Sequence, residues 1–145
     1  MRKTAFFLAL VLLFSSCAKK QANREPDHIV VQHILIAFQG SIPKPTVTRT
    51  QQEAEKLAMK VFQEAKQGAD FDTLVKKYTD DQYPGIYRMA NKGVTPDRSK
   101  KEYSRENMVP AFGDVGFKLK VGEIGLAKYD PKKSPYGWHI IKRIK

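Results

Sequence analysis

Apolar residues along the chain alternate between strand-like and helix-like patterns. Short apolar runs bounded by turn residues predict four strands, at 30–36, 85–90, 124–129 and 138–144. Apolar residues at helical spacing predict three helices, at 50–68, 70–78 and 109–117. The resulting order, β-α-α-β-α-β-β, predicts an α+β fold. About 120 residues follow position 26, enough for one domain with its own core, and no internal repeat divides them.

Capping signals mark the ends of the first two helices. Thr50 and Glu53 have the spacing of a capping box at the start of the first helix, and Gly68 can end that helix. Asp70 or Asp72 can then cap the second helix.

One histidine lies inside an apolar run at each end of the chain. His33 lies within residues 30–36 and His139 within residues 136–141, each among β-branched or aromatic residues. A buried imidazole must find a hydrogen-bond partner, because it otherwise loses the free energy of its hydration. If the two segments are neighbouring inner strands, the histidines can be partners for each other.

Residues 1–16 have the three regions of a secretory signal peptide. Two basic residues precede an apolar stretch at 5–14, which ends in small residues. A transmembrane helix needs about 20 apolar residues, so this stretch is too short to span a bilayer. Residues 14–17 (Phe-Ser-Ser-Cys) resemble the bacterial lipobox, which implies that Cys17 carries a lipid.

Cys17 is the only cysteine of the chain and has no partner for an internal disulfide. In an oxidising compartment it would otherwise remain a free thiol, which favours lipidation. An ordinary signal peptide with an unmodified cysteine, or a buried structural cysteine, are the alternatives. Residues 17–26 would form a flexible tether. We expect an exported protein anchored to the bacterial cell envelope through the lipid. Ala18 is compatible with sorting to the outer membrane rather than the inner one.

The chain is strongly basic, with 26 Lys and Arg against 15 Asp and Glu and a formal net charge of +11. Removal of residues 1–16 would delete two basic residues and leave a charge of +9. An exported protein of this charge meets anionic lipids and acidic polymers rather than nucleic acid. The lysines are scattered and are not interleaved with aromatic residues. We therefore interpret them as a solvated surface and expect no nucleic-acid partner.

The order of several motifs over residues 29–145 resembles the parvulin family of peptidyl-prolyl isomerases. The motifs are the strand at 33–36 (His-Ile-Leu-Ile), the helix at 68–78 (Gly-Ala-Asp-Phe-Asp-Thr-Leu-Val-Lys-Lys-Tyr), the stretch at 108–112 (Met-Val-Pro-Ala-Phe), the turn at 119–124 and the strand at 136–141. The resemblance implies a single parvulin-like domain at 27–145, with a four-stranded, mostly antiparallel sheet surrounded by helices. It also implies catalysis of X-Pro rotation, unfolded or extended X-Pro polypeptides as partners, and no cofactor.

The resemblance implies an apolar pocket for the proline ring. Met108 and Phe112 would hold the ring, and Leu35 and Tyr136 would contribute to the cleft. Taken without the resemblance, an apolar pair at helical spacing indicates ordinary core packing, and this alternative stays open.

The resemblance also implies a polar group beneath the pocket. His33 and His139 would form paired imidazoles, and Ser134 would complete their hydrogen bonds. Asp81 would lie near the twisting amide, with Asp80 as the adjacent alternative. In this interpretation the histidines hold the geometry and polarity of the site, and neither is assigned as an acid or a base. Two imidazoles and a carboxylate can also bind a metal ion, but no short ligand spacing supports this, and we expect no metal.

The chain departs from the family pattern in two places. The glycine-rich element before the second strand is reduced to residues 83–87 (Tyr-Pro-Gly-Ile-Tyr), with Tyr87 where a glycine is common. Residues 94–107 form an insertion whose polar composition predicts a mobile loop. These departures keep a second hypothesis open, a parvulin-shaped module that holds extended peptides without turnover. A merely structural envelope lipoprotein is a third, which leaves the pocket residues unexplained.

Overall fold

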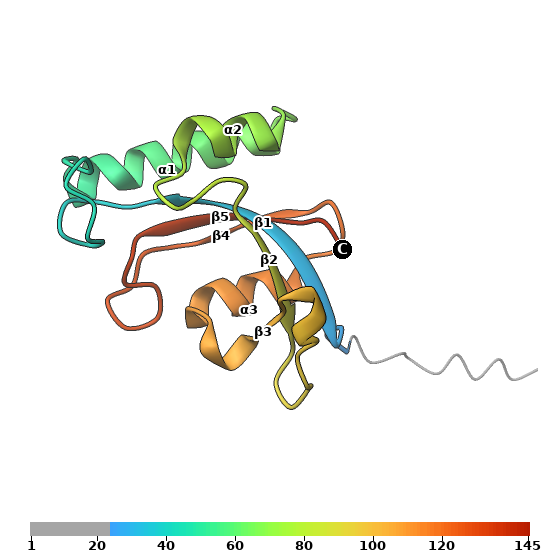
Figure 1. Cartoon of the computed structure of the whole chain (residues 1–145). Helices are drawn as coiled ribbons and strands as arrows, with labels where there is room; N and C mark the ends of the chain where they lie inside the picture. The colour runs from blue at the N-terminus through green and yellow to red at the C-terminus, as the bar shows by residue number, and fades with distance from the viewer. Residues whose placement is uncertain (1–23) are drawn as a thin grey trace, which may run out of the picture.

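The computed structural model describes residues 24–145, in which helices cover both faces of one sheet (Figure 1). The predicted signal peptide, Cys17 and the first part of the tether lie outside the described residues. The elements in chain order are β1 (His28–Ile36), α1 (Gln51–Lys66), α2 (Phe71–Tyr78), β2 (Ile86–Ala90), β3 (Tyr103–Ser104), α3 (Pro110–Lys118), β4 (Ile124–Ala127) and β5 (Trp138–Arg143). Two 3-10 helices, Arg98–Lys100 and Arg105–Asn107, flank β3. Within residues 24–145 no helix is both long enough and apolar enough to cross a membrane.

The sheet has five strands in the order β3-β2-β1-β5-β4. β1 lies at its centre and pairs antiparallel with β2 and β5, and β4 pairs antiparallel with β5. β3 pairs parallel with β2, with Tyr103 opposite Met89. The α+β class is confirmed, but the predicted count of four strands is wrong, because the inserted segment adds a fifth. A two-residue strand has no periodicity by which the sequence can reveal it.

The helix caps follow from local side-chain chemistry. The Thr50 hydroxyl accepts from the Glu53 amide at 3.2 Å, and the Glu53 carboxylate accepts from the Thr50 amide at 2.7 Å. This reciprocal pair is the predicted capping box. Asp70, rather than Asp72, caps α2, since its carboxylate accepts from the Thr73 amide at 2.8 Å.

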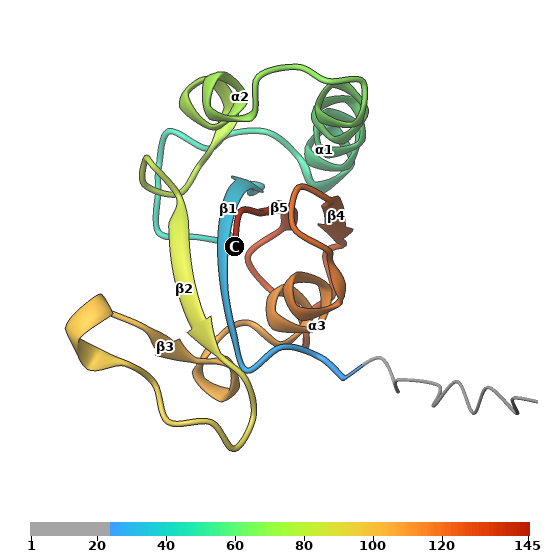
Figure 2. The ribbon, with the colours of Figure 1, turned by 90° about the vertical axis from the view of Figure 1, so that its right-hand side faces the viewer.

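Two apolar cores lie on opposite faces of the sheet. The core under α1 and α2 contains Ile34 and Ile36 of β1, whereas the core under α3 contains Ile29 and Val31 of the same strand. This alternation follows from the two-residue period of a strand. Figure 2 shows α1 and α2 on one side of the sheet and α3 on the other. The buried apolar residues of both cores lie between 29 and 141, so a chain that begins at residue 18 keeps the whole folded unit.

The predicted tether is partly bound to the domain. The Glu25 carboxylate accepts from the Arg105 guanidinium at 2.6 Å, and the Pro26 carbonyl accepts from the Asn91 side chain at 3.0 Å. The folded unit therefore includes at least the last two residues of the predicted tether, 17–26.

Candidate active site

Strand parity brings the two predicted histidines to the same face of the sheet. His33 and Leu35 alternate with Ile34 and Ile36 along β1, so their side chains face the α3 side. On β5, His139 lies directly opposite Leu35 in the antiparallel register. His33 is therefore a diagonal neighbour of His139 across the two strands. Both imidazoles are buried.

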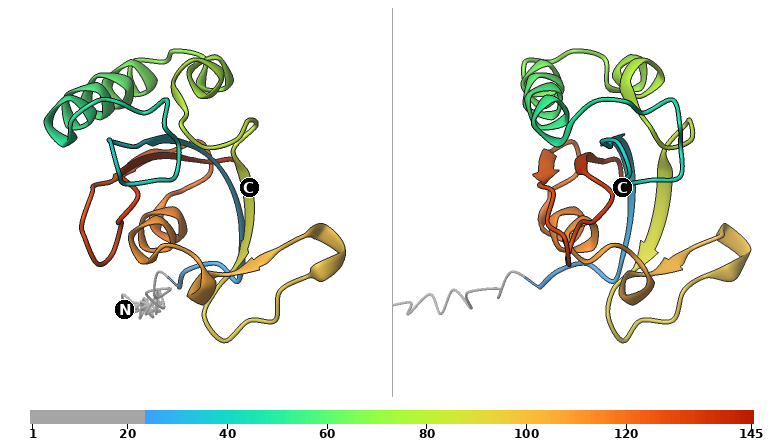
Figure 3. Two further views of the ribbon diagram at one scale, coloured as in Figure 1. Left: turned by 60° about the vertical axis from the view of Figure 1, so that its left-hand side comes forward. Right: turned by 90° about the vertical axis from the view of Figure 1, so that its left-hand side faces the viewer.

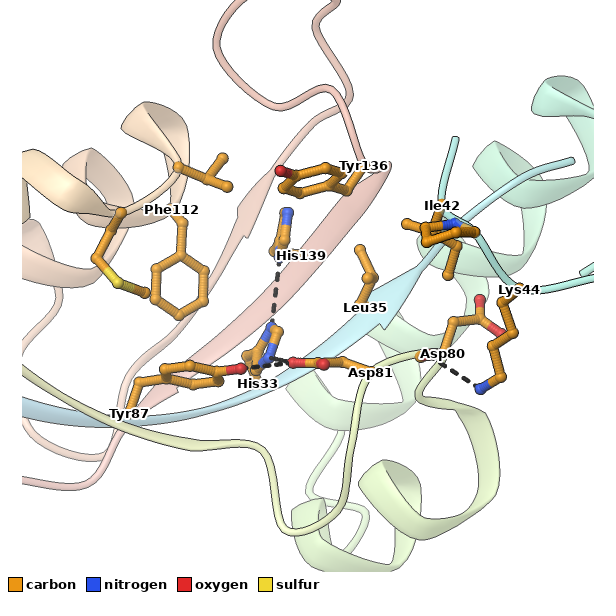
Figure 4. Close-up of a pocket in the computed structure, with 13 residues that line it drawn as sticks. His33, Leu35, Ile42, Lys44, Asp80, Asp81, Tyr87, Phe112, Tyr136 and His139 are labelled. Carbon is orange, nitrogen blue, oxygen red and sulfur yellow. Dashed lines mark hydrogen bonds and ion pairs between the residues drawn. The ribbon is translucent and has the colours of Figure 1, made fainter. Parts of the chain in front are cut away.

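Four polar side chains form one continuous hydrogen-bonded chain beneath a cavity (Figure 4). The Tyr87 hydroxyl donates to Asp81 Oδ2 at 2.8 Å, and His33 Nε2 lies 3.0 Å from the same oxygen. His33 Nδ1 in turn lies 3.3 Å from His139 Nδ1. A carboxylate only accepts hydrogen bonds, so His33 Nε2 carries a proton, and in the neutral pair His139 Nδ1–H donates to His33 Nδ1. This chain fixes the orientation of Asp81 and of both rings.

Aromatic rings enclose His33 on two sides. Its ring centroid lies 5.0 Å from that of Phe112 and 5.1 Å from that of Tyr87, both in edge-on geometry. Phe112 also contacts His139 edge-on at 5.5 Å. These contacts pack the Phe112 ring against both imidazoles.

Asp80 and Asp81 have different surroundings. The Asp80 carboxylate accepts from the Ala37 amide at 2.8 Å and pairs with Arg49, so it fastens the loop that follows β1. The Asp81 side chain is 29% exposed and opens toward the cavity. Both residues border the cavity, but the Asp80 side chain is only 9% exposed and is held by Arg49, so Asp81 is the more accessible carboxylate.

The cavity above the polar chain has a volume of about 450 Å³ and a mostly apolar wall. Met108 and Phe112 come from α3 and the turn before it, Leu35 from β1 and Tyr136 from the turn before β5. The four apolar residues predicted to bind substrate thus lie together around one cavity. Ile42, Pro43 and Lys44 close its far side, from the loop between β1 and α1.

Burial and hydrogen bonding set the charge states of the site. The hydrogen bond from His33, supported by that from Tyr87, holds the pKa of Asp81 well below its usual range despite partial burial. Burial, followed by the hydrogen bond to Asp81, raises the pKa of Tyr87 far above its usual value. Burial, with a smaller effect from neighbouring His33, lowers the pKa of His139 to about 3. At neutral pH the Asp81 carboxylate is therefore anionic, and the Tyr87 phenol and His139 are neutral.

A family model described as "PPIC-type PPIASE domain" matches residues 13–144, which is most of the chain. This chain belongs to the PpiC-type, or parvulin, family of peptidyl-prolyl isomerase domains. The family predicted from the order of the motifs is confirmed.

Curated relatives of this parvulin domain are longer proteins. Chaperone SurA of Pseudomonas fluorescens is 30% identical over 120 residues, which are 83% of this chain and 24% of that protein. Foldase protein PrsA 4 of Bacillus cereus is 32% identical over 100 residues, which are 69% of this chain and 31% of that protein. The chain thus spans about a quarter to a third of the length of these relatives.

Two solved structures share the fold. The solution structure of TbPIN1 covers 82% of this chain and 98% of its own, with a TM-score of 0.58 and 22% identity. The peptidyl-prolyl isomerase ESS1 from Candida albicans covers 82% of this chain and 63% of its own, with a TM-score of 0.59 and 19% identity. At these identities the likeness concerns the parvulin fold.

One predicted site residue has a different role in this parvulin domain. Ser134 is fully buried, and its hydroxyl donates to the Gly137 carbonyl at 2.9 Å. It therefore braces the turn before β5 and does not line the cavity. The prediction that Ser134 completes the hydrogen bonds of the histidines is wrong. His139 Nε2 is buried and has no hydrogen-bond partner among residues 24–145.

Sequence reasoning missed two contributions to the parvulin site. Tyr87 was recognisable only as a departure from the glycine pattern, and its hydrogen bond to Asp81 depends on the three-dimensional path of residues 81–87. The 42–44 wall comes from a loop whose sequence carries no periodicity. Gly85, the glycine that the reduced element keeps, has a φ of +65°, and a Cβ there would lie 2.6 Å from the His33 carbonyl oxygen.

His33 contacts both Asp81 and His139 through its two ring nitrogens. Within residues 24–145, no group of three or more His, Cys, Asp or Glu side chains is placed to hold a metal ion. His33 Nε2 and Asp81 are instead bonded to each other, and His139 turns one nitrogen to His33.

Proposed function

We propose that this chain is a peptidyl-prolyl isomerase that accelerates rotation about X-Pro bonds in extended polypeptides. The observation that carries the proposal is a mostly apolar cavity of about 450 Å³, large enough for a proline ring and its neighbours, which is bordered by the oriented carboxylate of Asp81. Membership of the parvulin family supports it.

The reaction needs neither a nucleophile nor a cofactor. The barrier to amide rotation is about 18–20 kcal/mol, because the twisted amide loses its resonance, whereas the cis and trans isomers of X-Pro differ by only about 0.5–1 kcal/mol. A catalyst must therefore bind the twisted amide more tightly than either planar form. It can do so by holding the proline ring, by excluding water and by placing charge where the electron distribution changes.

Each of these tasks has a candidate residue here. Met108 and Phe112 would hold the proline ring against Leu35, which leaves the preceding carbonyl free to turn. The planar amide carries partial negative charge on its carbonyl oxygen, and this charge decreases when resonance is lost. An Asp81 carboxylate near that oxygen would therefore raise the energy of the planar form more than that of the twisted form. His33 and Tyr87 would keep Asp81 charged and oriented.

We further propose that the protein is exported and anchored to the cell envelope through a lipid on Cys17, where it assists the folding of envelope or secreted proteins. The signal-like residues 1–16 and the lipobox-like residues 14–17 support this placement. Mass spectrometry of the protein purified from membranes tests it. A diacylglycerol-modified Cys17 at the N-terminus is expected, and an unmodified Cys17 within the purified chain would contradict it.

A holding module without turnover is the second candidate. It is favoured by the names of the longer relatives, a chaperone and a foldase, and by the departure at Tyr87. Such a module would bind X-Pro peptides in the same cavity without accelerating their exchange.

Substitution of Met108 tests whether the cavity binds peptide at all. Met108 is partly exposed at the cavity wall, so Met108→Ala should leave the fold intact while weakening peptide binding about tenfold, in line with the loss of a buried side-chain contact. Binding can be followed by NMR titration with an X-Pro peptide. Val121→Ala is the control, because Val121 is 63% exposed and does not line the cavity. Equal affinities for the parent and Met108→Ala would refute the cavity as the binding site.

A further inference from the structure

The inserted segment at 94–107 has a defined structure and ends beside the cavity. It leaves the end of β2, extends beyond the sheet and returns to α3 through β3 (Figure 3). Tyr103 lies opposite Met89 in the parallel β2–β3 pair. Because side chains opposite each other in a ladder point to the same face, Tyr103 shares the face of Met89 and, two residues earlier on β2, of Tyr87. This is the face that carries α3 and the cavity.

Tyr103 continues the aromatic wall of the cavity outward. Its ring centroid lies 5.9 Å from that of Tyr87, which lines the cavity and in turn lies 5.8 Å from Phe112. Yet 50% of Tyr103 remains exposed, an unusual fraction for a large ring on the inner face of a sheet. The row Phe112, Tyr87 and Tyr103 therefore leads from the proline pocket to an open aromatic surface.

A buried arginine fixes the segment that carries Tyr103. Arg105 lies two residues after Tyr103, and its guanidinium pairs with Glu25 at 2.6 Å and with Asp114 of α3 at 2.8 Å. It also donates to the Asn91 side chain at 2.8 Å and stacks on Phe117 with 4.7 Å to the ring centroid. These contacts join the inserted segment to β2, α3 and the N-terminal residues. The position of Tyr103 is thus set before any ligand binds, which lowers the entropic cost of binding.

We propose that Tyr103 forms a subsite beside the proline pocket that takes a bulky apolar or aromatic side chain next to the proline of an extended polypeptide. The inference rests on the proposed function only in taking the cavity as the proline site. The occupant of the Tyr103 subsite follows from its connection to the cavity. A polypeptide whose proline lies against Phe112 passes Tyr87 before it reaches Tyr103. The subsite gives the insertion a role in selecting X-Pro sequences.

Peptides that differ only beside the proline test this subsite. The protein is residues 18–145, and the peptides carry Ala, Leu or Phe either before or after a single proline. NMR titration gives the dissociation constants, and exchange spectroscopy gives the catalysed rate. At one of the two positions we expect Phe to bind about threefold to tenfold more tightly than Ala, as one aromatic contact permits.

Three variants separate the subsite from general effects. Tyr103→Ala should remove the preference for Phe and leave the affinity for the Ala peptide unchanged. Tyr103→Phe should retain the preference, because the ring rather than the hydroxyl makes the contact. Tyr83→Ala is the matched control, since Tyr83 is equally exposed, at 51%, but lies beside Asp72 and does not line the cavity. It should retain the preference.

The proposal is overturned if Tyr103→Ala keeps the Phe preference, or if it weakens the Ala and Phe peptides to the same extent. The two readouts keep this result apart from the isomerase proposal. Discrimination in binding that depends on Tyr103 but comes without accelerated exchange would support the subsite and contradict catalysis. Accelerated exchange without any discrimination would support catalysis and contradict the subsite.

Discussion

The buried His139 predicts a specific loss of stability in mild acid. A histidine in the unfolded chain has a pKa of about 6.5, whereas burial lowers the pKa of native His139 to about 3. Below pH 6.5 the unfolded state therefore binds a proton that the native state excludes. The stability is complete above pH 6.5 and falls as the pH decreases toward 3. Each pH unit costs about 1.4 kcal/mol, so the step from pH 7 to pH 5 should remove about 2 kcal/mol.

Denaturant unfolding at pH 7 and pH 5 measures this loss. Trp138 is the only tryptophan of the chain and is buried, so its fluorescence reports unfolding of the core. His139→Asn keeps a polar side chain that does not titrate, and it should lose less than about 0.5 kcal/mol over the same interval. Asp81 does not interfere, because its carboxyl titrates below this interval in both the native and the unfolded chain.

A surface histidine supplies the matched control. His28 has a half-exposed side chain that contacts Glu102, and His28→Asn should retain the acid-induced loss of the parent. The reasoning would be refuted if the parent and His139→Asn lost the same free energy between pH 7 and pH 5. That result would mean that His139 takes up a proton as readily in the native state as in the unfolded chain.

Three substitutions test other parts of the structure. Asp80→Asn should lower the free energy of unfolding by about 2 kcal/mol, because Arg49 loses its charged partner. Denaturant titration measures this change, and an unchanged midpoint would show that Asp80 has no structural role. Tyr87→Phe should slow catalysed exchange about fivefold, the equivalent of one hydrogen bond of about 1 kcal/mol to Asp81. An unaltered exchange rate would exclude that role. Gly137→Ala should cost more than about 2 kcal/mol, because Gly137 has a φ of +136° and a Cβ there would overlap a backbone oxygen. A melting temperature equal to the parent's would contradict this.

Sequence patterns predicted the elements well where the physics is local. The capping box at Thr50 and the strand at 30–36 depend on neighbours in the chain, and the structure confirms both. The pairing of His33 with His139 also followed, because two apolar strands that each hold one histidine leave the imidazoles few other partners.

The parts that could not be predicted depend on tertiary contacts. β3 is held in place by the ion pairs of Arg105 with Asp114 and Glu25. The sequence pattern of residues 94–107 does not indicate these partners. Ser134 was assigned to the histidines, but the turn before β5 brings the Gly137 carbonyl within reach of its hydroxyl first. The family resemblance predicted which residues lie together in the site, whereas the hydrogen bonds between them could be identified only from the structure.

Asp80 and Asp81 show what the sequence leaves open and what the structure adds. Asp80 and Asp81 are adjacent in sequence and chemically identical, so composition and motif left the choice between them open. One residue step turns the first carboxylate to Ala37 and Arg49 and the second to His33 and the cavity.

The most direct test of the central claim is cis–trans exchange in X-Pro peptides, followed by NMR with residues 18–145 and with an Asp81→Ala form. We expect the parent to accelerate exchange of at least one peptide. We expect Asp81→Ala to bind the same peptide but to catalyse its exchange at least tenfold more slowly, a change of about 1.4 kcal/mol in the barrier. A folded parent that binds these peptides without accelerating any of them would contradict the isomerase and leave a holding module.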